Sequence, residues 1–376
     1  MTLGHFVDDL YPGFLPPLLP VFIDKFGLSL ALAGVLGTVL ALTTSLAQFG
    51  FGCLADRVGR RFFVVVGPLM ACVFLSVMPL APSYGLLVVF LALGGLGVAS
   101  FHPSAVSLTA SFASVRRNLA VAIFASAGAV GAAVGAMFIL AIVTSFGVER
   151  SYLAMTPGLI LVLLLAFGTP RARPRPSAVA PGGSSILKHS KLLSLVWAVA
   201  VIRAGVVMGY ENFIPVIVRE GGGSLLFGGT AVFLFLMCGS VGGLIGGYLS
   251  DRIDPRKILL FSSIAPVPFL IAFLLAGPPY DLIALGLAGA SLFAGVPITI
   301  VIAQEAVPER TSTASSLAMG VAWGIGGFGS AGVGALGDVI GVGGALFVLA
   351  LFSLAAAPFI PFLPGRKAEA GRVPLR

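Results

Sequence analysis

Two histidines and two adjacent carboxylates have the clearest capacity for chemistry in this chain. His5 and Asp9 stand four residues apart near its start, Asp8 lies beside Asp9, and His102 follows much further along. A spacing of four places His5 and Asp9 on one face of a helix. An imidazole beside a carboxylate in a poorly hydrated setting can exchange a proton near neutral pH. The four residues are therefore candidates for proton coupling. The alternative is that His5 lies at a membrane surface and His102 only bonds a neighbouring helix.

A second group of candidates lies near the middle of the chain. Arg203 stands in an apolar run, and its planar guanidinium suits a carboxylate or a phosphonate. Its alternative role is a structural ion pair with Asp8, Asp9 or Glu211. Tyr210 is seven residues further on, nearly on the same helical face, whereas Glu211 turns away from it. We treat all three as substrate-binding candidates, and Glu211 is also a candidate second protonation site or partner of Arg203.

The composition defines the elements that must position these residues. Of 376 residues, 58% are hydrophobic and only 10% are charged, and the mean hydropathy is +1.09. Soluble domains carry about 25% charged residues, so a water-soluble enzyme or binding module is excluded. A helix needs about 20 apolar residues to cross a bilayer. Runs of that length recur along the chain, which predicts an all-α integral membrane protein.

Proline, glycine and charge clusters divide the apolar stretches into twelve predicted transmembrane helices. An even number of crossings places both chain ends on one side of the membrane. The predicted spans lie near 3–26, 28–54, 61–80, 84–113, 117–146, 149–168, 191–219, 224–250, 256–276, 279–306, 311–337 and 340–363.

The basic residues predict which side that is. Lys25, Arg150 and Arg219 lie on one side of the predicted membrane, and Arg203 lies within a span. Lysine and arginine collect in cytoplasmic loops, so both termini are expected in the cytoplasm. The net charge of +8 then needs no nucleic-acid partner. The other 18 of the 22 basic residues, all on the predicted cytoplasmic side, are Arg57, Arg60, Arg61, Arg116, Arg117, Arg171, Arg173, Arg175, Lys188, Lys191, Arg252, Arg256, Lys257, Arg310, Arg366, Lys367, Arg372 and Arg376.

One long polar segment separates the first six predicted spans from the last six. Residues 169–190 are rich in arginine, proline, glycine and serine, a composition that cannot bury a core and is typical of a flexible linker. We therefore predict a six-helix bundle over 1–168, a cytoplasmic linker over 169–190, a second six-helix bundle over 191–363 and a cytoplasmic tail over 364–376.

An internal repeat supports this division. A Gly-x-x-x-Asp-Arg pattern begins at Gly52 and again at Gly247, displaced by 195 residues, and Pro103 pairs with Pro297 at a displacement of 194. Two similar bundles inserted the same way up form a parallel repeat. The charged loops at the repeats can favour one of two conformations, and we interpret them as a conformational gate. The gate candidates are Gly52, Asp56, Arg57, Gly59, Arg60, Arg61, Asp251 and Arg252.

The Gly-x-x-x-Asp-Arg-x-Gly-Arg-Arg loop resembles the signature of the major facilitator superfamily. Within it, the chain is similar to the fosmidomycin-resistance family of bacterial drug efflux proteins. The motifs that carry this resemblance are His5-x-x-x-Asp9, Phe101-His102-Pro103, and Ala303-Gln304-Glu305 with Pro308 and Arg310. The chain departs from the family at Asp8, where asparagine is typical, and at Gly128-x-x-Gly131-x-x-x-Gly135-Ala136, which lacks the family's closing proline.

The resemblance implies a transporter of the bacterial inner membrane that expels small toxic compounds in exchange for protons by alternating access. In the superfamily, the first, fourth, seventh and tenth spans line a central cavity. His5, Asp9 and His102 are therefore expected to converge there. The leading hypothesis is proton-coupled efflux by a monomer, with anionic or phosphonate-like compounds among the candidate substrates.

Other classes receive less support from the residues. The three cysteines have no disulfide or zinc spacing, so no metal is expected. No Walker sequence is present, so ATP is not expected to drive transport. The expected energy source is a proton gradient, and no cofactor is expected. The glycines of the eleventh span indicate close helix packing, while Glu305, Glu309 and Asp338 lie near span ends and are expected to be structural. Proton-coupled uptake or facilitated transport of a metabolite remains an alternative on the same fold. A membrane receptor or enzyme is a remote one.

Overall fold

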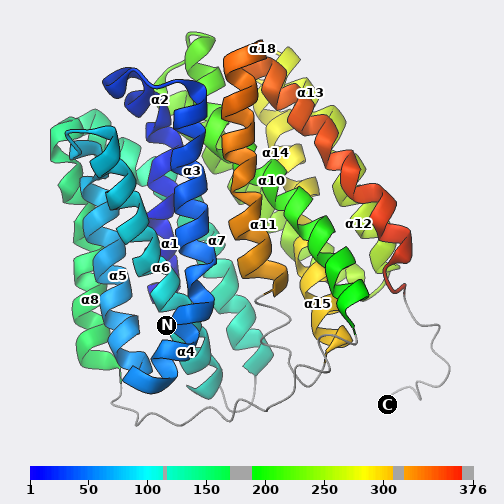
Figure 1. The fold of residues 1–376 in the computed structure, drawn as a ribbon, viewed down its shortest axis with the longest axis horizontal. Coiled ribbons are helices and arrows are strands. Elements are labelled where there is room, and N and C mark those ends of the chain that lie inside the picture. The colour runs from blue at the N-terminus through cyan, green and yellow to red at the C-terminus, as the bar shows by residue number, and fades with distance from the viewer. Residues whose placement is uncertain (113–116, 170–188, 308–316, 366–376) are drawn as a thin grey trace.

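The computed structural model describes residues 1–112, 117–169, 189–307 and 317–365, and these are helical with no strand among them. The elements up to residue 168 form one group of helices (Figure 1). They are α1 (Thr2–Leu10), η1 (Pro12–Phe14), α2 (Leu15–Phe26), α3 (Leu30–Ser45), α4 (Ala47–Val58), α5 (Arg60–Val77), η2 (Met78–Leu80), α6 (Tyr84–Phe112), α7 (Arg117–Phe146), η3 (Val148–Met155) and α8 (Thr156–Gly168).

The helices from residue 190 onward form the second group. They begin at Ser190, the last residue of the predicted linker, of which only residues 169, 189 and 190 lie within the described part. The tail over 364–376 is likewise described only to residue 365. The elements are α10 (Ser190–Glu220), α11 (Leu225–Ser250), α12 (Pro255–Ile264), α13 (Pro266–Leu275), α14 (Tyr280–Phe293), α15 (Val296–Ala306), η5 (Leu317–Val321), α17 (Ala322–Gly326), α18 (Phe328–Phe352) and η6 (Ser353–Phe362).

Ten helices in the described part of the chain are long and apolar enough to cross a membrane. The twelve predicted spans agree with this fold, and the count of ten differs only at the two ends of the sequence. The first span, expected over 3–26, consists of α1, η1 and α2, each too short to be counted alone, because proline removes a backbone donor and clashes with the preceding turn. The last two spans are contained in the run Met319–Phe362, in which the chain turns back at the non-helical Gly341, where φ is +79° (Figure 1).

Contacts within each group and between the groups define the architecture. In the first, α1 packs on α7 and α5 on α6, while in the second α11 packs on α14 and α10 on α18. The two groups meet through α3 with α18, α7 with α11, and α10 with α2. Figure 1 shows the blue and teal helices of the first group beside the green-to-red helices of the second. The polar candidates on α1 and α10 therefore lie on the central helices of the two groups.

A second internal repeat marks the equivalent parts of α1–α2 and α10. Segments 11–16 and 210–215 share the pattern Tyr-x-x-Phe-x-Pro and are displaced by 199 residues, from Tyr11 to Tyr210. Both tyrosine side chains are fully buried and donate hydrogen bonds to backbone carbonyls of other elements. These two segments therefore occupy corresponding places in the two halves.

Glycines bring several helices into backbone contact. A Cβ at Gly131 of α7 would collide with the backbone of Phe6, and one at Gly135 with the backbone of Leu10. In the predicted eleventh span, a Cβ at Gly329 would collide with Gly205 and one at Gly334 with Leu30. Close helix packing was the interpretation from sequence for the eleventh span, and the structure confirms it at Gly329 and Gly334.

Two of the acidic residues interpreted as structural lie in the described part. Asp338 accepts hydrogen bonds from the backbone nitrogens of Leu30 and Ala31 at 2.8 and 3.0 Å, and so caps α3 from a distant helix. A carboxylate stabilises the free amides of a helix N-terminus, which confirms its structural role. Glu305 is exposed at the end of α15. Glu309 lies outside the described residues.

Candidate functional site

Three side chains from α1 and α6 form a compact ionisable triad. The Nε2 atom of His5 lies 3.1 Å from Asp9 Oδ2, and the Nε2 atom of His102 lies 3.1 Å from Asp9 Oδ1. The two Nε2 atoms are themselves 3.1 Å apart. The fold therefore brings together the residues that the sequence analysis expected to converge. We call His5, Asp9 and His102 the triad.

Backbone carbonyls fix the positions of the protons on both imidazoles. His5 Nδ1 lies 2.6 Å from the carbonyl oxygen of Phe124 in α7, and His102 Nδ1 lies 2.8 Å from that of Val98. A carbonyl oxygen can only accept, so each Nδ1 carries a hydrogen and donates it. A neutral ring then has no hydrogen on Nε2. Two bare Nε2 atoms and a carboxylate would thus face one another, and only a cation between them relieves the repulsion.

The triad is built for one small cation. A proton on either Nε2 can be shared with the other ring and with Asp9. The three residues also bring one donor atom each within 4.8 Å of the others, and two imidazoles with a carboxylate can hold a transition-metal ion. The sequence analysis expected no metal, because the three cysteines have no zinc spacing. The fold instead brings together two histidines that stand 97 residues apart along the chain. A proton and a metal ion are therefore competing occupants of the same space.

Access to the triad comes from Asp9 and His102. Their side chains are 22% and 19% exposed, so the cluster communicates with the exterior of the protein. His5 is buried, and its ring stacks on that of Phe124 with centroids 4.0 Å apart and planes 9° from parallel. This stacking holds the His5 ring in one orientation, whereas Asp9 and His102 are the members of the triad that can be reached from outside.

Asp8 is the least compensated charge near the triad. It is fully buried, and neither carboxylate oxygen accepts a hydrogen bond. Its nearest cationic neighbour is His102, whose Nδ1 lies 3.6 Å from Asp8 Oδ2 but donates to Val98. An ionised carboxylate without donors is costly in a low-dielectric interior. A positive charge on His102 is the nearest group that would reduce this cost if Asp8 is ionised.

Gly128 explains how α7 approaches the triad so closely. A Cβ at this position would lie 2.6 Å from His5 Nε2 and closer still to Asp9 Oδ2. Only glycine leaves room there for both side chains. The glycine pattern of the fifth predicted span drew attention to this residue, but its contact with the triad could not be read from the pattern.

Arg203 lies in the second half and has one free end. Its side chain is 6% exposed, and Nη2 donates to Thr299 Oγ1 at 2.9 Å while Nη1 has no hydrogen-bond partner. A Cβ at Gly295 would lie 2.9 Å from Nη1, so glycine opens space in front of that atom. The sequence contains no pattern that would have identified Thr299 or Gly295 as its neighbours.

The alternative role considered for Arg203, an ion pair with Asp8, Asp9 or Glu211, is not found in the described structure. No oxygen of Asp8, Asp9 or Glu211 lies within 4.0 Å of its guanidinium in the described structure. The reason is that Asp8 and Asp9 point into the first half, whereas Arg203 contacts α15 of the second. Glu211 is two turns further along α10 and lines a separate cavity beside Pro12 and Asn212.

Tyr210 and Glu211 have different surroundings although they are adjacent. The Tyr210 hydroxyl donates to the carbonyl of Leu346 at 2.8 Å, and the side chain is fully buried. It lines neither of the two cavities described below. Its contact with substrate therefore stays a prediction. Glu211 lines a cavity of about 90 Å³ that also contacts Pro12, Thr44 and Asn212.

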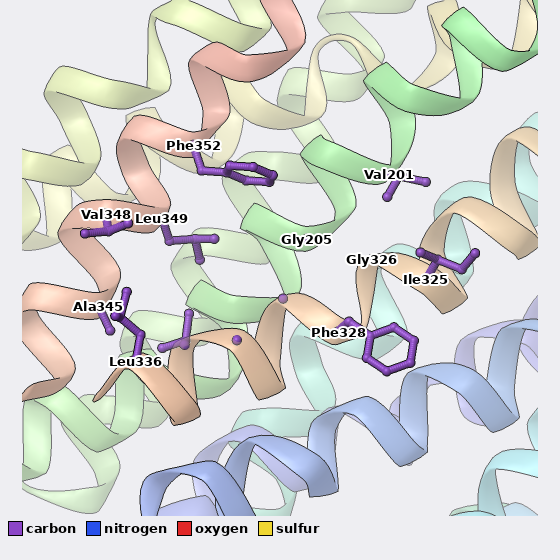
Figure 2. A pocket seen from close by; sticks show the side chains of 13 residues that line it. Val201, Gly205, Ile325, Gly326, Phe328, Leu336, Ala345, Val348, Leu349 and Phe352 are labelled. Atoms are coloured by element: carbon purple, nitrogen blue, oxygen red, sulfur yellow. The ribbon is translucent and has the colours of Figure 1, made fainter. Parts of the chain in front are cut away.

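A larger cavity of about 380 Å³ lies between α10, α17 and α18. Figure 2 shows its lining side chains, including Val201, Phe328, Val348 and Phe352, and all of them are hydrocarbon. Phe328, Val348 and Phe352 are also exposed on the molecular surface. A charged group would find no partner there, so this cavity is not the site of ionic recognition.

The predicted gate is only partly described. Gly59 joins α4 to α5 with a φ of +112°, a backbone conformation that favours glycine. Arg61 donates a hydrogen bond to the carbonyl of Ala166 in α8, and the guanidinium of Arg252 lies 3.8 Å from the centre of the Tyr248 ring. The side chain of Asp56 lies outside the described part. The gate role of these residues therefore stays a prediction.

A helical membrane protein with two repeated halves and ionisable side chains at membrane depth is a secondary transporter in its architecture. The chain belongs to the Major Facilitator Superfamily, whose family model matches residues 1–331. It is thus a multi-pass membrane protein that binds small molecules, and not an enzyme.

Several relatives match over most of their length. The Fosmidomycin resistance protein of Escherichia coli (strain K12) is 24% identical, and the Uncharacterized MFS-type transporter YfnC of Bacillus subtilis (strain 168) is 25% identical. Each alignment covers 90% of this chain and 85% of the relative. Among solved structures, a bacterial homologue of the human lysosomal transporter Spinster has a TM-score of 0.78 at 17% identity, covering 96% of this chain and 94% of that one. This chain and the Spinster homologue therefore share a fold although their sequence identity is low.

Proposed function

We propose that this protein is an antiporter that exports small toxic organic compounds in exchange for protons by alternating access. The observation that carries the proposal is the triad, in which two Nε2 atoms and the Asp9 carboxylate face one another at 3.1 Å. Such a group retains one proton and releases it only when its surroundings change. A conformational change that alters access to the triad would therefore be linked to proton movement.

The direction of transport is supported by the names of relatives. Besides the Fosmidomycin resistance protein, the Multidrug resistance protein MdtG of Escherichia coli (strain 55989 / EAEC) is 26% identical over 300 residues, which is 74% of this chain and 72% of that protein. Both names refer to drug resistance, and export of the drug is the way in which a transporter would provide it. Uptake with a proton would use the same triad, so direction must be measured separately.

We propose the bacterial cytoplasmic membrane as the location, with both termini on the cytoplasmic side. The support is the sequence bias of 18 of 22 basic residues toward one side. With this orientation, the start of α1 lies at the cytoplasmic end, and the triad is closer to that end than Tyr11 is. Cytoplasmic protons would then have the shorter path to Asp9 and His102.

Anion recognition by Arg203 is a second candidate for the substrate contact. The observation in its favour is the free Nη1 atom beside Gly295. A carboxylate or phosphonate oxygen would satisfy that atom with a charge-assisted hydrogen bond. Arg203 lies among α10, α12 and α15, so an anion must enter the second half to reach it.

The proposed function is tested in proteoliposomes that contain a pH-sensitive dye and hold an imposed proton gradient. Addition of a substrate should dissipate the gradient, and accumulated substrate should move against its own concentration gradient. The panel should include organic cations, phosphonates and neutral compounds of similar size. A protein that moves a panel member without any proton movement would refute antiport, and proton movement in the same direction as the substrate would indicate uptake.

A further inference from the structure

The cavity at Glu211 lies where the two repeats face each other. Pro12 follows Tyr11 and Glu211 follows Tyr210 in the two Tyr-x-x-Phe-x-Pro segments, and both Pro12 and Glu211 line this one cavity. Equivalent positions of the repeats thus meet across it. In transporters built from repeats, the substrate site lies at the repeat interface. We call this space the interface cavity.

The polar groups of the interface cavity offer acceptors. Glu211 has no ion-pair or hydrogen-bond partner among the described residues. Asn212 is 4% exposed, and its Nδ2 donates to the carbonyl of Met208 at 2.8 Å, which leaves Oδ1 buried and without a partner. The Thr44 hydroxyl donates to Leu40 at 2.8 Å, so its oxygen is free to accept. The carbonyl oxygen of Met208 can only accept a hydrogen bond, so the Asn212 side chain must present Nδ2 to it. The Nδ2 and Oδ1 atoms of Asn212 therefore cannot exchange places.

Packing holds Asn212 in this place. A Cβ at Gly37 of α3 would lie 2.8 Å from Asn212 Nδ2 and 2.6 Å from Ser330 Oγ. Only glycine at position 37 therefore lets α3 approach the amide so closely. Asn212 is the member of the cavity that the sequence analysis did not identify, although the Tyr-x-x-Phe-x-Pro repeat could have singled out its segment.

The walls of the cavity limit what can occupy it. Most of its other lining side chains are hydrocarbon, from Pro12, Leu15, Pro16, Leu40 and Ala41. A hard metal cation takes about six oxygen ligands, and three acceptor groups with apolar walls do not provide them. The volume of about 90 Å³ exceeds the roughly 10–15 Å³ that one water needs. The chemistry fits an organic cation with N–H donors.

We propose that the interface cavity binds the protonated amine of a small organic cation, with Glu211 as counterion and Asn212 and Thr44 accepting its N–H groups. An unpaired buried carboxylate is costly, and a bound ammonium removes that cost. The apolar walls then contact the hydrocarbon part of the ligand. The inference rests on the proposed function for its meaning as a substrate class, whereas the binding itself is independent of proton coupling.

The test is a binding titration on the purified full-length protein with four matched probes. They are n-butylammonium, n-butanol, butyrate and tetramethylammonium, which separate charge, sign and N–H donors. We expect n-butylammonium to bind at least about tenfold more tightly than n-butanol, and tetramethylammonium and butyrate to bind more weakly than n-butylammonium. Glu211→Gln should reduce the affinity for n-butylammonium to that for n-butanol, and Glu211→Asp should restore part of it.

Several results would overturn the inference. They are equal binding of ammonium and alcohol, preference for butyrate, and an unchanged affinity in Glu211→Gln. If Glu211→Gln does not fold, the probe order on the wild-type protein still decides the matter. Binding and transport of n-butylammonium without proton movement in proteoliposomes would refute the antiporter and leave the cavity assignment intact. Proton-coupled export of other compounds without any binding of n-butylammonium would refute the cavity assignment and leave the antiporter intact.

Discussion

The Nε2 atoms of His5 and His102 face each other at 3.1 Å, although both rings have already committed Nδ1 to a backbone carbonyl. Two neutral imidazoles in this arrangement would repel through their lone pairs. Asp9 adds a third acceptor at 3.1 Å from each ring. The pair of histidines can therefore remain in this geometry only while a cation is shared among the three residues.

Replacement of Asp9 tests whether that cation is the coupling proton. Asp9→Asn should reduce substrate-driven proton movement to the level of protein-free liposomes, because the amide cannot release a proton. Substrate binding should persist, since the amide resembles a protonated carboxyl group. The measurement is dye quenching together with a binding titration. Asp24→Asn is the matched control, because Asp24 lies on the same predicted span but is 65% exposed and pairs only with the exposed Arg219. Wild-type coupling in Asp9→Asn would reject this role.

Gly128→Ala should disrupt the triad through size alone. The added methyl would have to displace His5 or Asp9, and overpacking of this kind costs about 1–3 kcal/mol. We expect a lower Tm and loss of proton coupling. Gly332→Ala is the control, because a Cβ there meets nothing within 4 Å and alanine favours a helix. If both variants behave like the wild type, the close approach of α7 does not matter for coupling.

Chelation distinguishes a proton from a metal ion at the triad. We expect transport by protein prepared in EDTA to equal that of untreated protein, because one proton satisfies both imidazoles and Asp9. Added zinc should inhibit by competing for the same nitrogen atoms. Loss of transport in EDTA followed by recovery with zinc would show that the occupant is a metal.

Arg203 variants separate anion binding from a structural role. For n-propylphosphonate, affinity should fall in the order Arg203, Arg203→Lys, Arg203→Gln, because lysine keeps the charge but loses the planar fork. The affinity for n-butanol should change little across the series. Binding titrations with both compounds measure this. Equal losses for the two compounds, with a lower yield of folded protein, would mean that the bond to Thr299 only stabilises the helix packing.

The orientation of the protein can be measured with a single cysteine. Ser184→Cys lies in the predicted cytoplasmic linker, outside the described residues. An impermeant thiol reagent should label it in inverted membrane vesicles and leave it unlabelled in intact cells, because the basic bias places this segment inside. Ready labelling in intact cells would invert the topology. The natural cysteines are replaced in both samples, so that they contribute no signal.

Much of the architecture followed from composition and repeats. The apolar runs, the division near residue 168 and the duplicated Gly-x-x-x-Asp-Arg loops are local or periodic features. The break in the first span could also have been predicted, since Pro12 and Pro16 lie within it and proline interrupts a helix. The predicted boundary between the last two spans, at 337–340, lies beside Gly341, because a glycine that takes a positive φ allows the chain to turn back there.

The candidate site was predictable only in part. The spacing of His5 and Asp9 predicted that both lie on one face of a helix. The hydrogen bond from His5 to Phe124 could not be predicted, because its acceptor is a backbone carbonyl, which every residue has. The partners of Arg203 depended on the rotation of α10 about its own axis. That helix is apolar over most of its circumference, so no hydrophobic stripe fixed the rotation.

Helix α7 touches both halves of the molecule. Its Phe124 carbonyl holds His5, and further along its length Met137 lies 3.7 Å from the Thr230 hydroxyl of α11. The glycine contacts of α7 with α1, at Gly131 and Gly135, lie between these two points. A single rigid helix thus links the support of His5 to the contact between the halves, so a tilt of one half against the other is expected to displace the Phe124 carbonyl relative to the His5 ring.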